Sequence, residues 1–151
     1  MGTPYSKVFN AYLSRVTDDL YGAMDVQELE IELIQVMEAA LPRFPYPKTD
    51  IYDYDHETKQ FNVDLSNAEI QIIASLMNLI WTEQKIHDID LTRQIYGDND
   101  FNKHGTQAFH LRALLDVKRE LEIQVRRMMH TYGKVKNREP DFEGLAGGTR
   151  R

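Results

Sequence analysis

The chain has 151 residues, 42% of them hydrophobic and 28% charged, a composition that predicts one globular domain and excludes a disordered or fibrous protein. It contains no cysteine, which excludes disulfides, thiolate metal sites and a cysteine nucleophile. The formal net charge of −6 conceals an asymmetry, because residues 1–100 hold 7 Lys and Arg against 18 Asp and Glu, whereas residues 101–151 hold 11 against 6. The two halves should attract, within one chain or between neighbouring copies, and a primary nucleic-acid ligand is disfavoured.

Two amphipathic helices are predicted at the start of the chain. Apolar residues recur at spacings of three, four and seven over 4–21, which predicts a helix that ends at Gly22. Asp25 followed three residues later by Glu28 is typical of a helix N-terminus. The second helix should then continue to Pro42.

The next segment alternates instead of repeating at helical spacing. Its prolines favour extended backbone, and aromatic and β-branched residues predict strands over 51–54 and 60–65, joined by a turn over 55–59. We therefore expect a small β-hairpin, at about residues 50–65, that projects from a helical body.

A capping box marks the start of the central helix. Ser66 and Glu69 stand at the required spacing, and apolar residues from Ile70 onwards cover a wide arc of the helix. Trp81 is expected on the buried face of this helix, which should weaken towards residue 95 before a turn or loop over 96–105.

A long last helix is predicted from Thr106, with Gly133 as its C-cap. Residues 134–151 are polar, aperiodic and glycine-containing, so they form no core element and are read as an arm. The predicted fold is mainly α, with a four-helix bundle-like body, a small hairpin and an extended C-terminal arm. We divide the chain into a helical domain with a hairpin insertion over 1–133 and the arm over 134–151.

The sequence shows no grouping of catalytic or metal-binding residues. Glu83 and His87 have the i, i+4 spacing of two ligands on one helix face, but no third ligand accompanies them, so a surface hydrogen bond is the better interpretation. The alternating acids Asp53, Asp55 and Glu57 lack the glycine and glutamate that a calcium loop requires at its sixth and twelfth positions. We expect no enzyme, no catalytic residue, no metal site and no cofactor.

Basic residues of the last helix alternate with acidic ones. Mixed charge of this kind indicates a solvated face or a subunit interface more than a nucleic-acid site. The basic residues expected at such an interface are Arg112, Arg119, Arg126 and Arg127.

The stretch from 61 to 132, about half of the chain, resembles the head-completion or head-to-tail adaptor (connector, neck) proteins of tailed bacteriophages. The resemblance is a pattern of helix starts and buried positions. It is carried by Phe61, Asp64, Leu65, Glu69, Ile70, Ala74, Leu76, Met77, Trp81, Asp100, Phe101, Gln107, Ala108, His110, Leu111 and Leu114.

The resemblance implies a structural virion protein. Such subunits assemble with themselves into a ring, commonly a dodecamer, that lies beneath the portal protein and extends the DNA channel towards the tail. It implies localisation at the head–tail interface of the virion, reached from the host cytoplasm, with no membrane partner and only passing, non-specific contact with genomic DNA.

The resemblance also implies roles for two segments. The arm would bind the portal, with Phe142 and Leu145 as apolar anchors and Arg150 and Arg151 as salt-bridging groups. The acidic hairpin, with Asp53, Asp55 and Glu57, would line the channel or meet the next neck or tail-completion protein.

Two other functions stay open at this stage. The first is a helical DNA-packaging accessory or regulatory protein that binds nucleic acid through the last helix. The second is an enzyme with Glu83 and His87 as metal ligands.

Overall fold

The computed structural model describes residues 2–16, 19–103 and 105–148, and the side chains of these residues except 19–20, 92–108 and 135–148. In chain order the elements are β1 (Thr3–Pro4), α1 (Tyr5–Leu13), α2 (Asp19–Ala23), α3 (Val26–Ala40), the 3₁₀ turn η1 (Leu41–Arg43), β2 (Tyr54–Asp55), β3 (Gln60–Phe61), α4 (Asn67–Lys103) and α5 (Gly105–Gly148). The expected mainly helical fold with a small hairpin is confirmed. None of the described helices carries an apolar stretch long enough to cross a lipid bilayer.

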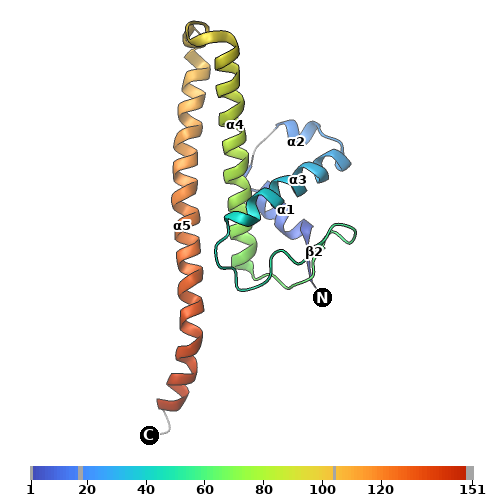
Figure 1. Ribbon diagram of the computed structural model, residues 1–151, viewed down its shortest axis with the longest axis vertical. Helices are drawn as coiled ribbons and strands as arrows, with labels where there is room; N and C mark the ends of the chain where they lie inside the picture. Colours follow the sequence, from blue (N-terminus) through green and yellow to red (C-terminus); the bar gives the residue numbers. More distant parts are fainter. Residues whose placement is uncertain (1, 17–18, 104, 149–151) are drawn as a thin grey trace.

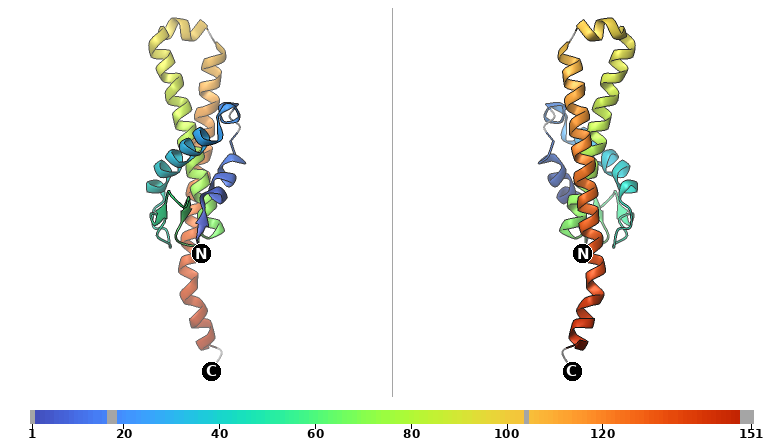
Figure 2. Two further views of the ribbon diagram at one scale, coloured as in Figure 1. Left: turned by 90° about the vertical axis from the view of Figure 1, so that its right-hand side faces the viewer. Right: turned by 90° about the vertical axis from the view of Figure 1, so that its left-hand side faces the viewer.

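The long helices α4 and α5 lie side by side and run in opposite directions (Figure 1). The remaining elements lie on the side of α4 that faces away from α5, as the two turned views also show (Figure 2). The lower end of α5 continues past the body as a projecting arm (Figure 1). α4 is therefore the central helix, with α1 and α3 packed on one side and α5 on the other.

The core lies where α1 and α3 cross the first half of α4. Ile73 and Met77 of α4 are fully buried, as the wide apolar arc of the sequence predicts. The start of α4 is also as predicted, because the Ser66 backbone N–H donates to Glu69 Oε1 at 3.0 Å and the Glu69 N–H donates to Ser66 Oγ at 3.2 Å. Trp81, expected on the buried face, is only half-buried at the edge of this core.

The first predicted helix is wrong in its length. α1 ends at Leu13, and a separate short helix, α2, contains Gly22 near its end. Ser14 explains the break, because its hydroxyl donates to the carbonyl of Ala11 at 2.8 Å and closes the last turn. The Tyr12 and Tyr21 hydroxyls, 2.8 Å apart, then hold α2 against α1.

The hairpin forms, but with shorter strands than predicted and with an additional partner. Tyr54 pairs with Phe61 in antiparallel register, and β1 adds a third strand when Thr3 pairs with Phe61 on its other side. Tyr5 seals this sheet against α1, because its ring lies 5.4 Å from the ring of Phe61 in an edge-on arrangement. The hairpin is therefore attached to α1 and does not project freely from the body.

Two predicted boundaries of the last helices are wrong. The expected loop over 96–105 is helical up to Lys103, and α5 continues through Gly133 to Gly148 instead of ending there. Once a helix is nucleated, each further residue adds a hydrogen bond at little cost, so a single glycine does not stop it. The arm of 134–151 accordingly leaves the body as a continuation of α5, with a helical backbone through Gly148.

Candidate functional site

The outer face of α5 carries a run of exposed side chains between residues 109 and 130. Leu114, Val125 and Tyr132 are buried on the opposite face, which packs towards the body. Arg112, Arg119 and Arg126 recur every seven residues, and seven residues are close to two helical turns, so their side chains share one face.

All four arginines expected at a subunit interface lie on the exposed part of α5. Arg112, Arg119, Arg126 and Arg127 are each exposed, and none of them forms an ion pair with another described residue. The structure thus brings these predicted residues together as one basic stripe. Their charges are available to an acidic surface or to phosphate.

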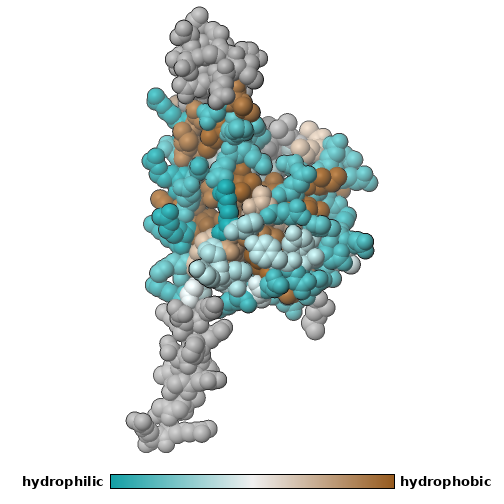
Figure 3. Space-filling view, viewed as in Figure 1, coloured by the Kyte–Doolittle hydropathy of each residue, from teal (hydrophilic) through white to brown (hydrophobic). Residues whose placement is uncertain are grey.

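Apolar and acidic side chains interrupt this stripe. Phe109 is 75% exposed and Ile123 is 41% exposed, and the acids Asp116 and Glu120 are also exposed on α5. In the space-filling view, hydrophobic patches likewise break the hydrophilic surface along α5 (Figure 3). We call these arginines, with Phe109 and Ile123, the α5 outer face. Its mixture of cationic and apolar groups suits a protein surface better than a bare phosphate backbone.

The acidic residues expected to act together on the hairpin lie close in sequence, but two of them hold the turn. Asp53 Oδ1 accepts a hydrogen bond from Asn62 Nδ2 at 2.8 Å, and Asp55 Oδ1 accepts one from the backbone N–H of Glu57, also at 2.8 Å. The Asp55 contact is typical of an Asx turn, and the Asp53 contact joins the two sides of the hairpin, so the structural role of both is local. The side chain of Glu57 is exposed.

The residues expected to bind the portal belong to the arm of 134–151. The side chains of Phe142 and Leu145 lie outside the described residues, as do Arg150 and Arg151 entirely. What is described is the helical backbone that carries positions 142 and 145 away from the body.

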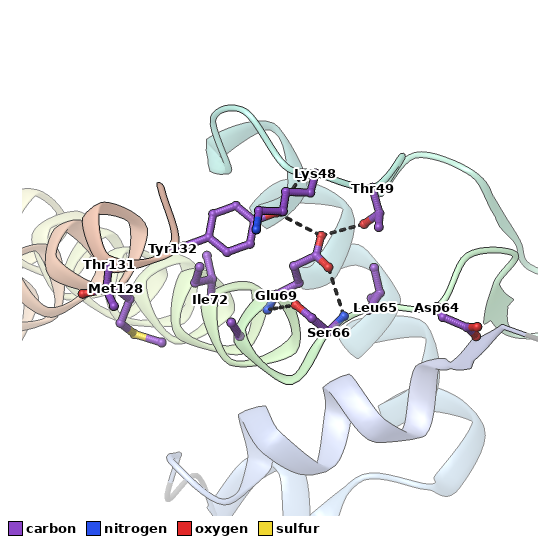
Figure 4. Close-up of a pocket in the computed structure, with 11 residues that line it drawn as sticks. Lys48, Thr49, Asp64, Leu65, Ser66, Glu69, Ile72, Met128, Thr131 and Tyr132 are labelled. Carbon is purple, nitrogen blue, oxygen red and sulfur yellow. Dashed lines mark hydrogen bonds between the residues drawn. The ribbon is translucent and has the colours of Figure 1, made fainter. Parts of the chain in front are cut away.

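A pocket of about 700 Å³ lies between the start of α4 and the end of the packed part of α5 (Figure 4). Glu69 is buried beside it, with its Oε2 accepting hydrogen bonds from Thr49 Oγ1 at 2.6 Å and from the Tyr132 hydroxyl at 3.3 Å. The Tyr132 oxygen in turn accepts a hydrogen bond from the backbone N–H of Lys48 at 2.6 Å. We call these residues the Glu69 cluster, and they join α4, α5 and the loop after η1.

Burial and hydrogen bonding act in opposite directions on Glu69. Burial alone would raise the pKa of its carboxyl, but hydrogen bonds from Thr49, Ser66 and Tyr132 outweigh that effect and lower the pKa below its ordinary value. For Tyr132, burial and the negative charge of Glu69 raise the pKa of the phenol, against the hydrogen bond from Lys48. The carboxylate is thus a structural anion whose acceptors are already used. The capping box predicted only its contacts with Ser66.

Glu83 forms ion pairs with cationic side chains and not with His87, the second metal ligand that the i, i+4 spacing suggests. Its two carboxylate oxygens accept hydrogen bonds from Arg43 at 2.9 and 2.7 Å, and Lys118 lies 3.9 Å from it. His87, on the next turn of α4, is exposed. Among the described residues, no three His, Asp or Glu side chains are grouped so as to hold a metal ion.

Comparisons with known protein families, with characterised proteins and with solved structures find no match for this chain.

Proposed function

We propose that this protein is the subunit of a head-to-tail adaptor of a tailed bacteriophage. Its copies assemble side by side into a ring beneath the portal, and the ring extends the DNA channel towards the tail. The C-terminal arm binds the portal, and the hairpin lines the channel or meets the next neck or tail-completion protein. The family resemblance of 61–132 suggests this role.

The observation that carries the proposal is the path of α5. Its first part is held to α4 by buried side chains, of which Tyr132 is the last described one, and its backbone then continues beyond the body for a further turn and more (Figure 1). Along that length the backbone of α5 lies away from the packed body of its own chain (Figure 1). Such a segment is suited to contact a second protein.

The charge distribution also supports assembly. The body is acidic and α5 carries the unpaired arginines, so one copy presents both signs of charge to its neighbours. An acidic inner surface would keep DNA from adhering while it passes, because like charges repel at short range. The exposed Glu57 of the hairpin is in keeping with that role.

Reconstitution with the cognate portal tests the proposal. The purified chain is mixed with portal rings, and the complexes are separated by size and imaged by electron microscopy. We expect rings of this chain on the portal. A chain that stays monomeric with the portal present and gives no complex contradicts the proposal.

The arm contact is tested by variants within it. Phe142→Ala with Leu145→Ala should weaken portal binding at least about tenfold, because burying two apolar side chains contributes about 1.5–3 kcal/mol each. Asn137→Ala, in the same segment, is the matched control and should bind normally. Equal binding by all three proteins would remove the arm from the contact.

The competing nucleic-acid function is favoured by one observation, the exposure of Arg126 and Arg127, which form no ion pair with another described residue. It predicts salt-dependent DNA binding that is lost when both are changed to Ala, since phosphate contacts release counterions. The adaptor function predicts only weak binding near physiological salt. Fluorescence anisotropy with a short DNA duplex at two salt concentrations distinguishes the nucleic-acid function from the adaptor function.

A further inference from the structure

The outer face of α3 carries exposed acidic and apolar side chains, and not all of its acids form ion pairs with described residues. The segment 25–40 contains five acidic residues and no Lys or Arg. Two of these acids have a partner. Glu30 Oε2 lies 2.8 Å from Lys59 Nζ, and Glu38 Oε1 lies 2.6 Å from His56 Nε2. Glu28 is exposed and Glu32 is half-buried, and neither forms an ion pair with a described residue.

A large apolar side chain accompanies these acids. Ile31 is 59% exposed, although α3 buries Leu33, Val36 and Met37 on its other side. In the space-filling view, hydrophobic surface is also visible near α3 (Figure 3). Exposed aliphatic side chains beside unpaired acids are typical of a surface that is covered in an assembly. We call Glu28, Ile31 and Glu32 the α3 outer face.

This face and the α5 outer face lie on opposite sides of the molecule. α4 separates α3 from α5, and the turned views show α3 in front from one side and α5 in front from the other (Figure 2). The two surfaces therefore cannot meet within one chain. They can meet between two chains that are placed side by side in the same orientation.

The two faces also match in chemistry. α3 offers acids and an aliphatic group, and the α5 outer face offers arginines and apolar groups. Each face would repel a second copy of itself because of its like charges, which disfavours a two-fold dimer through either one.

We propose that the α3 outer face of one copy binds the α5 outer face of the next copy, in a heterologous contact that repeats from subunit to subunit. This proposal rests on the proposed function, because it identifies the contact through which the adaptor assembles. A heterologous contact closes into a ring when its rotation divides the circle and otherwise continues as a filament. Arg119 and Arg126 supply the cationic side, and Glu28 and Glu32 supply the anionic side.

Charge reversal on each face tests the pairing. The first variant carries Arg119→Glu with Arg126→Glu, and the second carries Glu28→Lys with Glu32→Lys. Each variant alone would place like charges across the contact, which costs several kcal/mol, so its self-association should weaken about 10²-fold or more. Mixed in equal amounts, the two variants present opposite charges at both contacts and should assemble in alternation. Mass photometry and light scattering after size exclusion give the masses, and circular dichroism checks that each variant is folded.

Matched controls separate this contact from a general effect of net charge. Lys7→Glu changes an exposed residue of α1 and should assemble like the wild type. A mixture of the arginine variant with Asp64→Lys, which adds positive charge outside α3, should give no alternating assembly. The arginine variant can only end an assembly there, because its α3 face is intact and its α5 face still repels the α3 face of Asp64→Lys.

Three outcomes would contradict the proposal. If the wild-type chain forms no assembly with or without portal, the proposed function fails and this contact with it. If the wild type assembles and either reversed variant assembles equally well, the proposed function stands and this contact is wrong. If both folded variants stay apart when mixed, the α3 and α5 faces are not partners.

Discussion

At the scale of single residues, the Glu69 cluster shows how one side chain serves two purposes. Glu69 closes the capping box at the start of α4 and also accepts hydrogen bonds from the hydroxyls of Thr49 and Tyr132. The first role follows from four consecutive residues, so the sequence predicts it. The second joins residues 20 and 63 positions away in the chain, and no local pattern of residue types carries that information.

The lowered pKa of Glu69 predicts a loss of stability in acid. Its ordinary value is 4.5, and the folded-state value is lower, so the native state binds fewer protons than the unfolded state between these values. The stabilisation is therefore present above pH 4.5 and is lost as the pH falls through the folded-state pKa. Glu69→Gln should lower the free energy of unfolding at pH 7 by about 1–3 kcal/mol and reduce its dependence on pH below 5. Urea unfolding at several pH values measures both, and Glu120→Gln, at an exposed carboxylate, is the control. An acid dependence as steep in Glu69→Gln as in the wild type would contradict this role.

The partial exposure of Trp81 sets the expected cost of removing it. Full burial would predict a loss of about 3–5 kcal/mol for Trp81→Ala, but this indole is half-buried and lies 5.8 Å from Lys85 Nζ. We expect a loss of about 1–2 kcal/mol, in proportion to the smaller buried area. Phe61→Ala, at a fully buried ring, should cost about 3–5 kcal/mol and is the comparison. Chemical denaturation should therefore show a larger loss of unfolding free energy for Phe61→Ala than for Trp81→Ala.

At the scale of elements, periodicity predicted the helices well and their limits poorly. α3 and α4 begin where Asp25 and Ser66 indicate. Ser66 closes a capping box, whereas Asp25 takes the extended N-cap conformation without a side-chain capping hydrogen bond. Apolar spacing continues across Ser14, so it does not predict the break after α1. The sequence pattern does not predict β1 either, because this strand has two residues and its partner Phe61 is distant in the sequence. Short strands of this kind depend on tertiary contacts, which single-sequence patterns do not report.

The place of β1 in the sheet depends on Gly2. Its φ of +153° is strained for other residues, and a Cβ there would lie 2.4 Å from the carbonyl oxygen of Phe61. Gly2→Ala should therefore separate β1 from β3 and cost roughly 1–3 kcal/mol. Gly22→Ala is the control, because an added Cβ in α2 meets no atom within 4 Å and should leave stability unchanged or slightly higher. Thermal unfolding of the two variants compares them, and equal midpoints would contradict the role of Gly2.

The course of α5 through Gly133 gives the opposite prediction for a glycine. An added Cβ at Gly133 meets no atom within 4 Å, and among the described glycines positive φ occurs at Gly2 and not here. Gly133→Ala should stabilise the helix by about 1 kcal/mol, because glycine is a poor residue in a helix interior. If Gly133 were instead the left-handed C-cap that the sequence favours, alanine would destabilise the protein. The sign of the change in the unfolding midpoint distinguishes the two.

At the scale of the whole molecule, the fold separates a packed body from a projecting helix. The composition predicted this division, since residues 134–151 are polar and aperiodic and cannot supply a core. It did not predict that α5 would cross the boundary as one helix, because glycine and the charged residues after it weaken the helical pattern without preventing it. The sequence also does not predict that the α3 and α5 outer faces lie on opposite sides of the molecule, since this depends on how both helices pack on α4.

Removing the arm should therefore leave the fold and take away the contact with the larger partner. Tyr132, bound to Glu69 and packed 5.4 Å from the ring of Phe44, is the last described residue in the core, so a chain that ends at Gly133 keeps the packed body. We expect its unfolding midpoint to stay within a few degrees of the wild type, and its circular dichroism to show a loss limited to the arm. Its portal binding should be abolished while its self-association is retained, because the α3 and α5 outer faces lie before residue 133. A truncated chain that unfolds would place the arm inside the cooperative core, and one that binds the portal normally would move the portal contact to the body.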